Sequence, residues 1–147
     1  MAQLRSARMQ VVVDIARRAE EECAGTLQVV RSKLQQEQTK LVELENYYGE
    51  YENRFSVEIN TCSVVQLMQT RSFLQRLAVA IEGQKQQIIA VERTLSACRN
   101  EWHKRYLKHN SLKDLVARYR NEEARDRDVI EQKMIDEWVS SRPSQNT

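Results

Sequence analysis

Residues 56–63, Ser-Val-Glu-Ile-Asn-Thr-Cys-Ser, interrupt a chain that otherwise consists almost entirely of good helix formers. Short polar and β-branched side chains favour turns and helix caps over helix interiors. Ser63 begins the sequence Ser-Val-Val-Gln, in which the serine hydroxyl can accept from the amide of Gln66 while the glutamine side chain reaches back. The stretch therefore predicts a turn followed by a new helix that begins at about residue 64.

The composition outside this stretch excludes sheet folds. Three glycines and one proline occur in 147 residues, whereas an average chain contains roughly 12% of the two together. A sheet domain needs frequent turns, and these residues are what make turns possible. We expect one all-α domain over residues 1–140, with helix one at about 4–55, the turn at 56–63, helix two at about 64–139, and a disordered tail at 141–147.

A seven-residue repeat runs through both predicted helices. Spacings of four and three residues lead from Met9 to Phe55 and again from Leu67 to Tyr119, and most of these positions are apolar. Such a sustained repeat indicates a coiled coil. The polar exceptions at these positions are Glu20, Glu37, Thr70, Gln84, Arg105 and His109.

The short turn predicts that the two helices pack antiparallel. With the turn centred near residue 59.5, residues should face each other where their numbers total about 119, which places Cys23 near Cys98. Helix two is longer than helix one, so we expect it to have no partner within the chain beyond about residue 117.

The chain offers little for catalysis or for metal binding. An enzyme site needs a pocket under loops, so we expect no enzyme, no catalytic residue and no cofactor. His103 and His109 are six residues apart and do not have the spacing of metal ligands on one helix face, and the three cysteines show no CxxC spacing. We expect no metal site, and the cysteine usage favours a reducing cytoplasm.

Charge and hydropathy limit the possible partners. The formal net charge is +2, and no apolar run approaches the length of a membrane span. Residues 99–120 carry seven Lys or Arg against two acidic residues, while residues 121–137 carry three basic residues against seven acidic ones. The basic block has no nucleic-acid-binding motif, so we expect it to be a solvated face or a region that steers docking onto a charged protein.

Two groups of apolar residues fall outside the main repeat. Ile130, Met134 and Trp138 share one face of the unpaired end of helix two, which favours a partner that covers them over a frayed tail. Tyr47 and Phe73 lie beside the repeat near the turn, with Tyr51 close by. By themselves these aromatic residues favour a widened seam over a recognition surface.

Four motifs in order resemble the FliJ family, the small coiled-coil proteins of the bacterial flagellar type III export apparatus. They are Leu44-x-x-Tyr47-x-x-Glu50-Tyr51, Phe73-Leu-Gln-Arg-Leu77-Ala-x-Ala80-Ile81-x-x-Gln84, Trp102-His-Lys-Arg-Tyr106-x-Lys108 and Glu131-Gln-Lys-Met134-Ile-Asp136-Glu137. The resemblance covers about residues 5–140.

The resemblance implies a monomeric, non-enzymatic stalk protein. Such proteins dock in the hexameric export ATPase, promote its assembly and activity, contact the cytoplasmic domain of the export gate and escort export chaperones. They lie in the cytoplasm and, through their partners, at the cytoplasmic face of the inner membrane. By resemblance, the residues that would bind the gate are Leu44, Tyr47, Tyr51, Phe73, Leu77, Ala80 and Gln84, so the aromatic residues become a recognition surface.

The end of the hairpin that carries both termini would then face the ATPase. The candidates there are Val12, Ile15, Arg17, Arg18, Ile130, Met134 and Trp138. Two alternatives remain open: the equivalent stalk of a virulence injectisome, and a cytoplasmic scaffold that self-associates through its seam.

Overall fold

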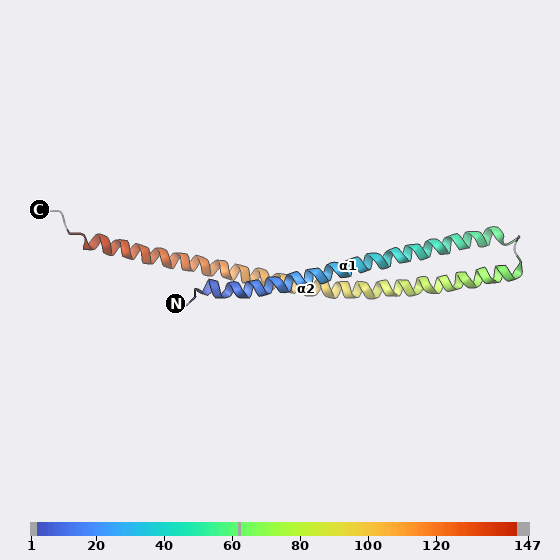
Figure 1. The fold of residues 1–147 in the computed structure, drawn as a ribbon, viewed down its shortest axis with the longest axis horizontal. Helices are drawn as coiled ribbons and strands as arrows, with labels where there is room; N and C mark the ends of the chain where they lie inside the picture. The colour runs from blue at the N-terminus through green and yellow to red at the C-terminus, as the bar shows by residue number, and fades with distance from the viewer. Residues whose placement is uncertain (1–2, 62, 144–147) are drawn as a thin grey trace. The chain divides into compact units, whose positions relative to one another are not determined.

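The computed structural model describes residues 3–61 and 63–143 of the chain. These residues form two helices, α1 (Arg5–Glu58) and α2 (Val64–Ser141), and they include no strand (Figure 1). The expected all-α hairpin is therefore confirmed. Neither helix contains, within the described residues, an apolar stretch long enough to cross a membrane.

The chain divides into two compact units, and each contains a segment of both helices. The terminal unit comprises residues 1–22 and 103–147, and the turn unit comprises residues 23–102. In the terminal unit, Ser6 pairs with Glu123 and Glu20 with His109, so the two segments are antiparallel. In the turn unit, Glu37 pairs with Gln84 and Tyr51 with Phe73, which gives the same orientation.

The turn between the helices lies within the expected stretch, but it is shorter, because α1 ends at Glu58, three residues later than expected. Ser56 lies within α1, and its hydroxyl donates to the carbonyl of Glu52. The amide of Thr61 donates to the carbonyl of Glu58 just after the helix ends. The Ser63–Gln66 capping box is present: the amide of Gln66 donates to Ser63 Oγ at 3.2 Å, and the amide of Ser63 donates to Gln66 Oε1 at 3.4 Å. Cys62 lies outside the described residues.

The seven-residue repeat matches the burial of side chains in both units. Every repeat position from Met9 to Phe55 and from Leu67 to Tyr119 is buried or partly buried, except Arg105. The buried apolar residues are Val13, Ala16 and Val116 in the terminal unit and Leu27, Ile88, Val91 and Leu95 in the turn unit. A narrow seam of this kind is what a two-helix coiled coil provides.

The predicted pairing register is wrong by several residues. The numbers of paired residues total 121 for Glu37 with Gln84, and 129 for Glu20 with His109, instead of 119. One reason is that each helical side chain points towards the N-terminus of its own helix. In an antiparallel pair, the Cα atoms of two contacting residues therefore both lie on the C-terminal side of the contact, which raises the total of their residue numbers. Cys23 and Cys98 are both free and partly buried.

The unpaired part of α2 begins later than residue 117, because α1 still reaches Glu123 through Ser6. From residue 125 to Ser141 α2 remains helical while every side chain is exposed. Ser141 is thus the last residue of α2 rather than part of a disordered tail. Residues 144–147 lie outside the described part of the chain.

Candidate protein-binding surfaces

Aromatic side chains of both helices meet in the turn unit. The rings of Tyr51 and Phe73 lie 4.6 Å apart at 59°, a tilted contact between α1 and α2. The guanidinium of Arg54 lies 5.3 Å from the centre of the Tyr51 ring. Tyr47 has 55% of its surface exposed. We refer to Tyr47, Tyr51 and Phe73 as the aromatic surface.

The other residues expected at this surface differ in accessibility. Ala80 is exposed, whereas Leu44 and Leu77 are partly buried at seam positions. Gln84 also belongs to the seam, where its Nε2 donates to the carbonyl and the carboxylate of Glu37. Of the seven predicted residues, only Tyr47 and Ala80 are therefore exposed, and the other five are partly buried.

The contact between Glu37 and Gln84 also affects the pKa of the Glu37 carboxyl group. The hydrogen bond from Gln84, followed by the positive charge of Lys40, holds the pKa of Glu37 below its ordinary value of 4.5. Lys40 Nζ lies 3.5 Å from Glu37 Oε1. Glu37 is thus ionised and hydrogen-bonded in the seam near neutral pH.

The projecting part of α2 in the terminal unit presents an apolar face. Ile130, Met134 and Trp138 are 57%, 63% and 58% exposed, and their spacing places them on one side of the helix. Val129, Ile135 and Val139 are also more than half exposed, at other positions around the same helix. Arg142 lies over the Trp138 ring at 4.3 Å. We refer to Ile130, Met134 and Trp138 as the overhang face.

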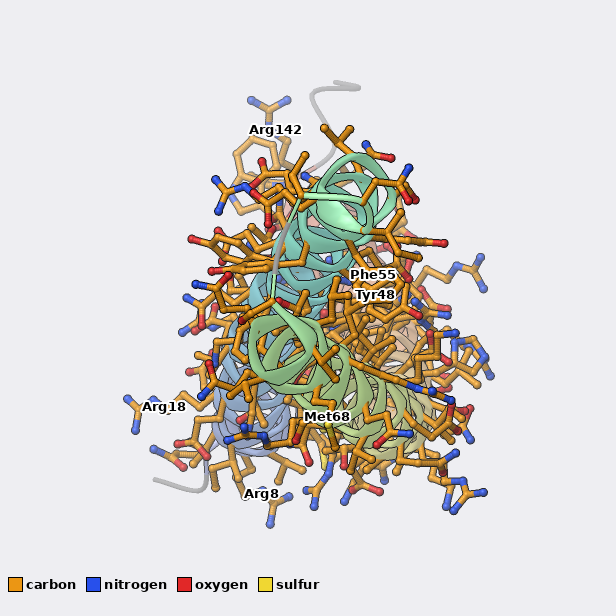
Figure 2. The ribbon with its side chains drawn as sticks, turned by 90° about the vertical axis from the view of Figure 1, so that its right-hand side faces the viewer. Arg8, Arg18, Tyr48, Phe55, Met68 and Arg142 are labelled. Carbon is orange, nitrogen blue, oxygen red and sulfur yellow. The ribbon has the colours of Figure 1, made fainter. Side chains whose placement is uncertain are left out.

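A second apolar strip of the terminal unit lies on α1. Val12 and Ile15 are exposed and line a small hollow together with Arg105 and Lys108 of α2. Arg17 and Arg18 are exposed on α1 as well. Figure 2 shows Arg8 and Arg18 extending outward from the helix. The seven residues expected to face the ATPase all lie in the terminal unit with exposed side chains.

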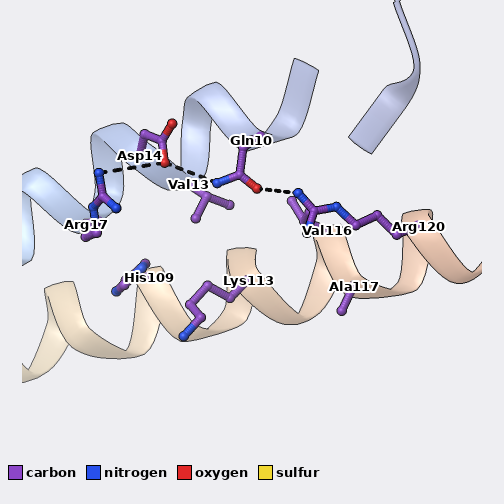
Figure 3. A pocket seen from close by; sticks show the side chains of 9 residues that line it. All are labelled: Gln10, Val13, Asp14, Arg17, His109, Lys113, Val116, Ala117 and Arg120. Carbon is purple, nitrogen blue, oxygen red and sulfur yellow. Dashed lines mark hydrogen bonds and ion pairs between the residues drawn. The ribbon is translucent and has the colours of Figure 1, made fainter. Parts of the chain in front are cut away.

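On the other flank of the seam, α1 and α2 of the terminal unit enclose a groove of about 460 Å³ (Figure 3). Its floor is apolar, and a chain of polar contacts closes one side: Arg120 donates to Gln10, Gln10 donates to Asp14, and Asp14 lies 3.9 Å from Arg17. The lining residues are Gln10, Val13, Asp14, Arg17, His109, Lys113, Val116, Ala117 and Arg120.

One region of the terminal unit is strongly basic, although five glutamates at 20–22 and 122–123 reduce the net charge of all the paired residues, 5–22 and 103–123, to +3. Residues 5–18 and 103–120 together contain ten Lys or Arg and two Asp, which gives a net charge of +8 with neutral histidines. Within the described residues, no group of His, Cys, Asp or Glu side chains could hold a metal ion. Exposed aliphatic and basic side chains together suit the binding of an acidic protein surface.

The sequence reasoning did not identify one buried polar pair of the terminal unit. Ser6 is buried, and its hydroxyl and amide both donate to the carboxylate of Glu123, at 2.6 and 3.0 Å. These hydrogen bonds, the hydroxyl first, hold the pKa of Glu123 below 4.5. Ser6 lies three residues before Met9, and Glu123 lies four residues after Tyr119, so both continue the 4-3 repeat by one step. This continuation of the repeat is the sequence feature that indicates their position in the seam.

Comparison with known proteins now decides the family. The model of the FliJ family, described as the flagellar FliJ protein, matches residues 5–147. The chain belongs to the FliJ family. Searches of curated proteins and of solved structures found no significant match.

Membership of the FliJ family makes this chain a component of the flagellar type III export apparatus. The FliJ family is a family of non-catalytic accessory proteins of this apparatus.

Proposed function

We propose that this FliJ-family chain is a stalk-like coiled coil that docks in the hexameric export ATPase through its terminal unit. Docking promotes assembly and activity of the ATPase. Through its turn unit, the chain contacts the cytoplasmic domain of the export gate, and it also escorts export chaperones. It acts as a monomer in the cytoplasm and, held by its partners, at the cytoplasmic face of the inner membrane.

The observation that carries this proposal is the overhang face. An isolated helix gains little stability in water without packing, yet α2 continues to Ser141 with Ile130, Met134 and Trp138 uncovered by the described chain. Three large apolar side chains on a projecting helix are typical anchors for a partner groove. Residues 5–18 and 103–120 of the same unit carry a net charge of +8, which supports docking of this region onto acidic partner surfaces, whereas residues 121–137 around the overhang face carry −4.

The aromatic surface supports the contact with the gate. Tyr47 is exposed one helical turn before Tyr51, whose ring contacts Phe73 in a tilted arrangement. Tyrosine rings supply much contact area at a low entropic cost and are enriched at binding hot spots. The structure leaves Tyr47 available for this role without any change in the seam.

The contribution of the overhang face can be tested with two matched variants. The first replaces Ile130, Met134 and Trp138 by Ser, and the control replaces Gln132, Lys133 and Asp136, on the opposite side of the same helix, by Ser. The cognate export ATPase is assayed for ATP turnover with each purified chain. We expect the first variant to lose most of the stimulation and the control to retain it. Equal stimulation by both variants would contradict the proposal.

A further inference from the structure

Exposed aliphatic side chains also line the side of α2 that faces away from α1 in the turn unit. Val65, Met68 and Val79 are 64%, 66% and 73% exposed, and Ile89 is exposed as well. These residues belong to a second 4-3 repeat that runs through Val65, Met68, Ser72, Gln75, Val79, Glu82, Gln86 and Ile89. Every side chain of this repeat is exposed.

The position of this second repeat follows from its offset. It precedes the main seam of Leu67, Thr70 and Leu74 by two residues, which is about 200° around a helix of 3.6 residues per turn. The main seam packs against α1, so the second repeat lies on the opposite side of α2. We refer to Val65, Met68, Ser72 and Val79 as the outer face of α2.

The outer face has the form of a helix-docking site. Ser72, Gln75, Arg76 and Val79 line a shallow hollow of about 280 Å³. The small side chain of Ser72, between Met68 and Val79, allows another backbone to approach closely. Heptad spacing with exposed aliphatic residues is what a further helix of a coiled coil requires.

Charge along the outer face indicates which helix fits. Between residues 64 and 88 the charged residues are Arg71, Arg76, Glu82 and Lys85, a net charge of +2. Arg71, Arg76 and Lys85 all fall at the positions that flank the second repeat, where charges select the partner of a coiled coil. Glutamate or aspartate at the flanking positions of the incoming helix would pair with them.

We propose that the outer face of α2 docks an amphipathic helix of a partner protein, with an apolar 4-3 stripe flanked by acidic side chains. This site is separate from the aromatic surface and from the terminal unit. The experiments on the outer face therefore test this proposal separately from the docking proposed for the ATPase and the gate.

Two designed peptides test the inference with the full-length chain. Both carry the same Ile and Leu stripe with heptad spacing, and the flanking positions hold Glu in one peptide and Lys in the other. Binding is followed by fluorescence anisotropy of the labelled peptides. We expect the glutamate peptide to bind at least about tenfold more tightly than the lysine peptide, and the chain with Arg71→Glu and Arg76→Glu to reverse this preference.

Aliphatic contacts are tested by replacing Met68 and Val79 with Ser. The matched control replaces Val29 and Val42, two exposed valines of α1 in the same unit, with Ser. The first variant should lose binding and the control should retain it, while circular dichroism reports the helix content of both. Equal binding of the two peptides, no binding, or binding unaffected by the Met68 and Val79 changes would overturn the proposal. Dimerisation of the wild-type chain that the same changes abolish would make this face a contact between copies, which also overturns it.

Discussion

Gln84 Nε2 donates to both the main-chain carbonyl and the carboxylate of Glu37, at 2.8 and 2.6 Å. Two polar exceptions in the repeat are therefore partners of each other across the seam. Glu20 and His109 form a second such pair, in the terminal unit. Polar seam pairs specify the register of a coiled coil, because any other register leaves a partly buried polar group without its partner.

Replacing only one residue of the Glu37–Gln84 pair should therefore destabilise the fold more than replacing both. We expect Gln84→Leu to lower the thermal midpoint, since the carboxylate of Glu37 then loses its donor. The double variant Glu37→Leu with Gln84→Leu should recover much of the loss, because the two leucines extend the apolar seam. A double-mutant cycle measured by thermal unfolding gives the comparison, and a double variant that is less stable than Gln84→Leu alone would contradict it.

Acid should destabilise the fold through Glu37 and Glu123. Both carboxyl groups have a pKa lowered below 4.5 by hydrogen bonds present only in the folded chain. The folded state thus binds fewer protons than the unfolded state, so this stabilisation is present above pH 4.5 and is lost as the pH falls through the lowered pKa values.

Urea unfolding at a series of pH values below 5 measures this effect. The double variant Glu37→Gln with Glu123→Gln should lose less stability on acidification than the wild type, although it is less stable at pH 7. Glu45→Gln, at an exposed position of α1, serves as the control and should follow the wild-type curve. If the double variant and the wild type lose the same amount of stability below pH 5, Glu37 and Glu123 are not the cause of the acid sensitivity.

Two helical glycines offer simple stabilising substitutions. A Cβ added at Gly25 or Gly83 would have no neighbouring atom within 4 Å, and no glycine in the described residues has a positive φ. Alanine loses less conformational entropy in a helix, so Gly25→Ala and Gly83→Ala should each raise the free energy of unfolding by about 0.5–1 kcal/mol. Urea unfolding checks the change. A loss of stability would contradict this prediction and would mean that the glycines allow a bend in the helix.

The aromatic residues near the turn should separate binding from folding. Tyr47 is exposed, so Tyr47→Ala should weaken binding to the gate domain by about tenfold or more, the loss of roughly 1.4 kcal/mol, and leave the thermal midpoint unchanged. The Phe73 ring contacts the Tyr51 ring and is partly buried, so Phe73→Ala should also destabilise the fold, by about 1–3 kcal/mol. Calorimetric titration of the gate domain and thermal unfolding test both expectations. Unchanged gate binding by Tyr47→Ala would remove Tyr47 from the interface.

The sequence predicts the helices and the seam well, because the 4-3 repeat reports directly which side chains a coiled coil buries. It predicts the pairing register poorly, since register depends on the lean of side chains and on polar partners such as Ser6 and Glu123. The surfaces divide in the same way. The spacing of Ile130, Met134 and Trp138 indicates an exposed face, whereas the aromatic spacing does not reveal that Phe73 contacts Tyr51 while Tyr47 faces solvent.

Docking in the ATPase ring can be measured as ATP turnover by the cognate export ATPase, titrated with this chain at low salt. We expect turnover to rise, to saturate near one chain per ATPase hexamer, and to show no rise when residues 125–147 are removed. A flat response from an ATPase that forms rings under the same conditions would contradict docking as a stalk.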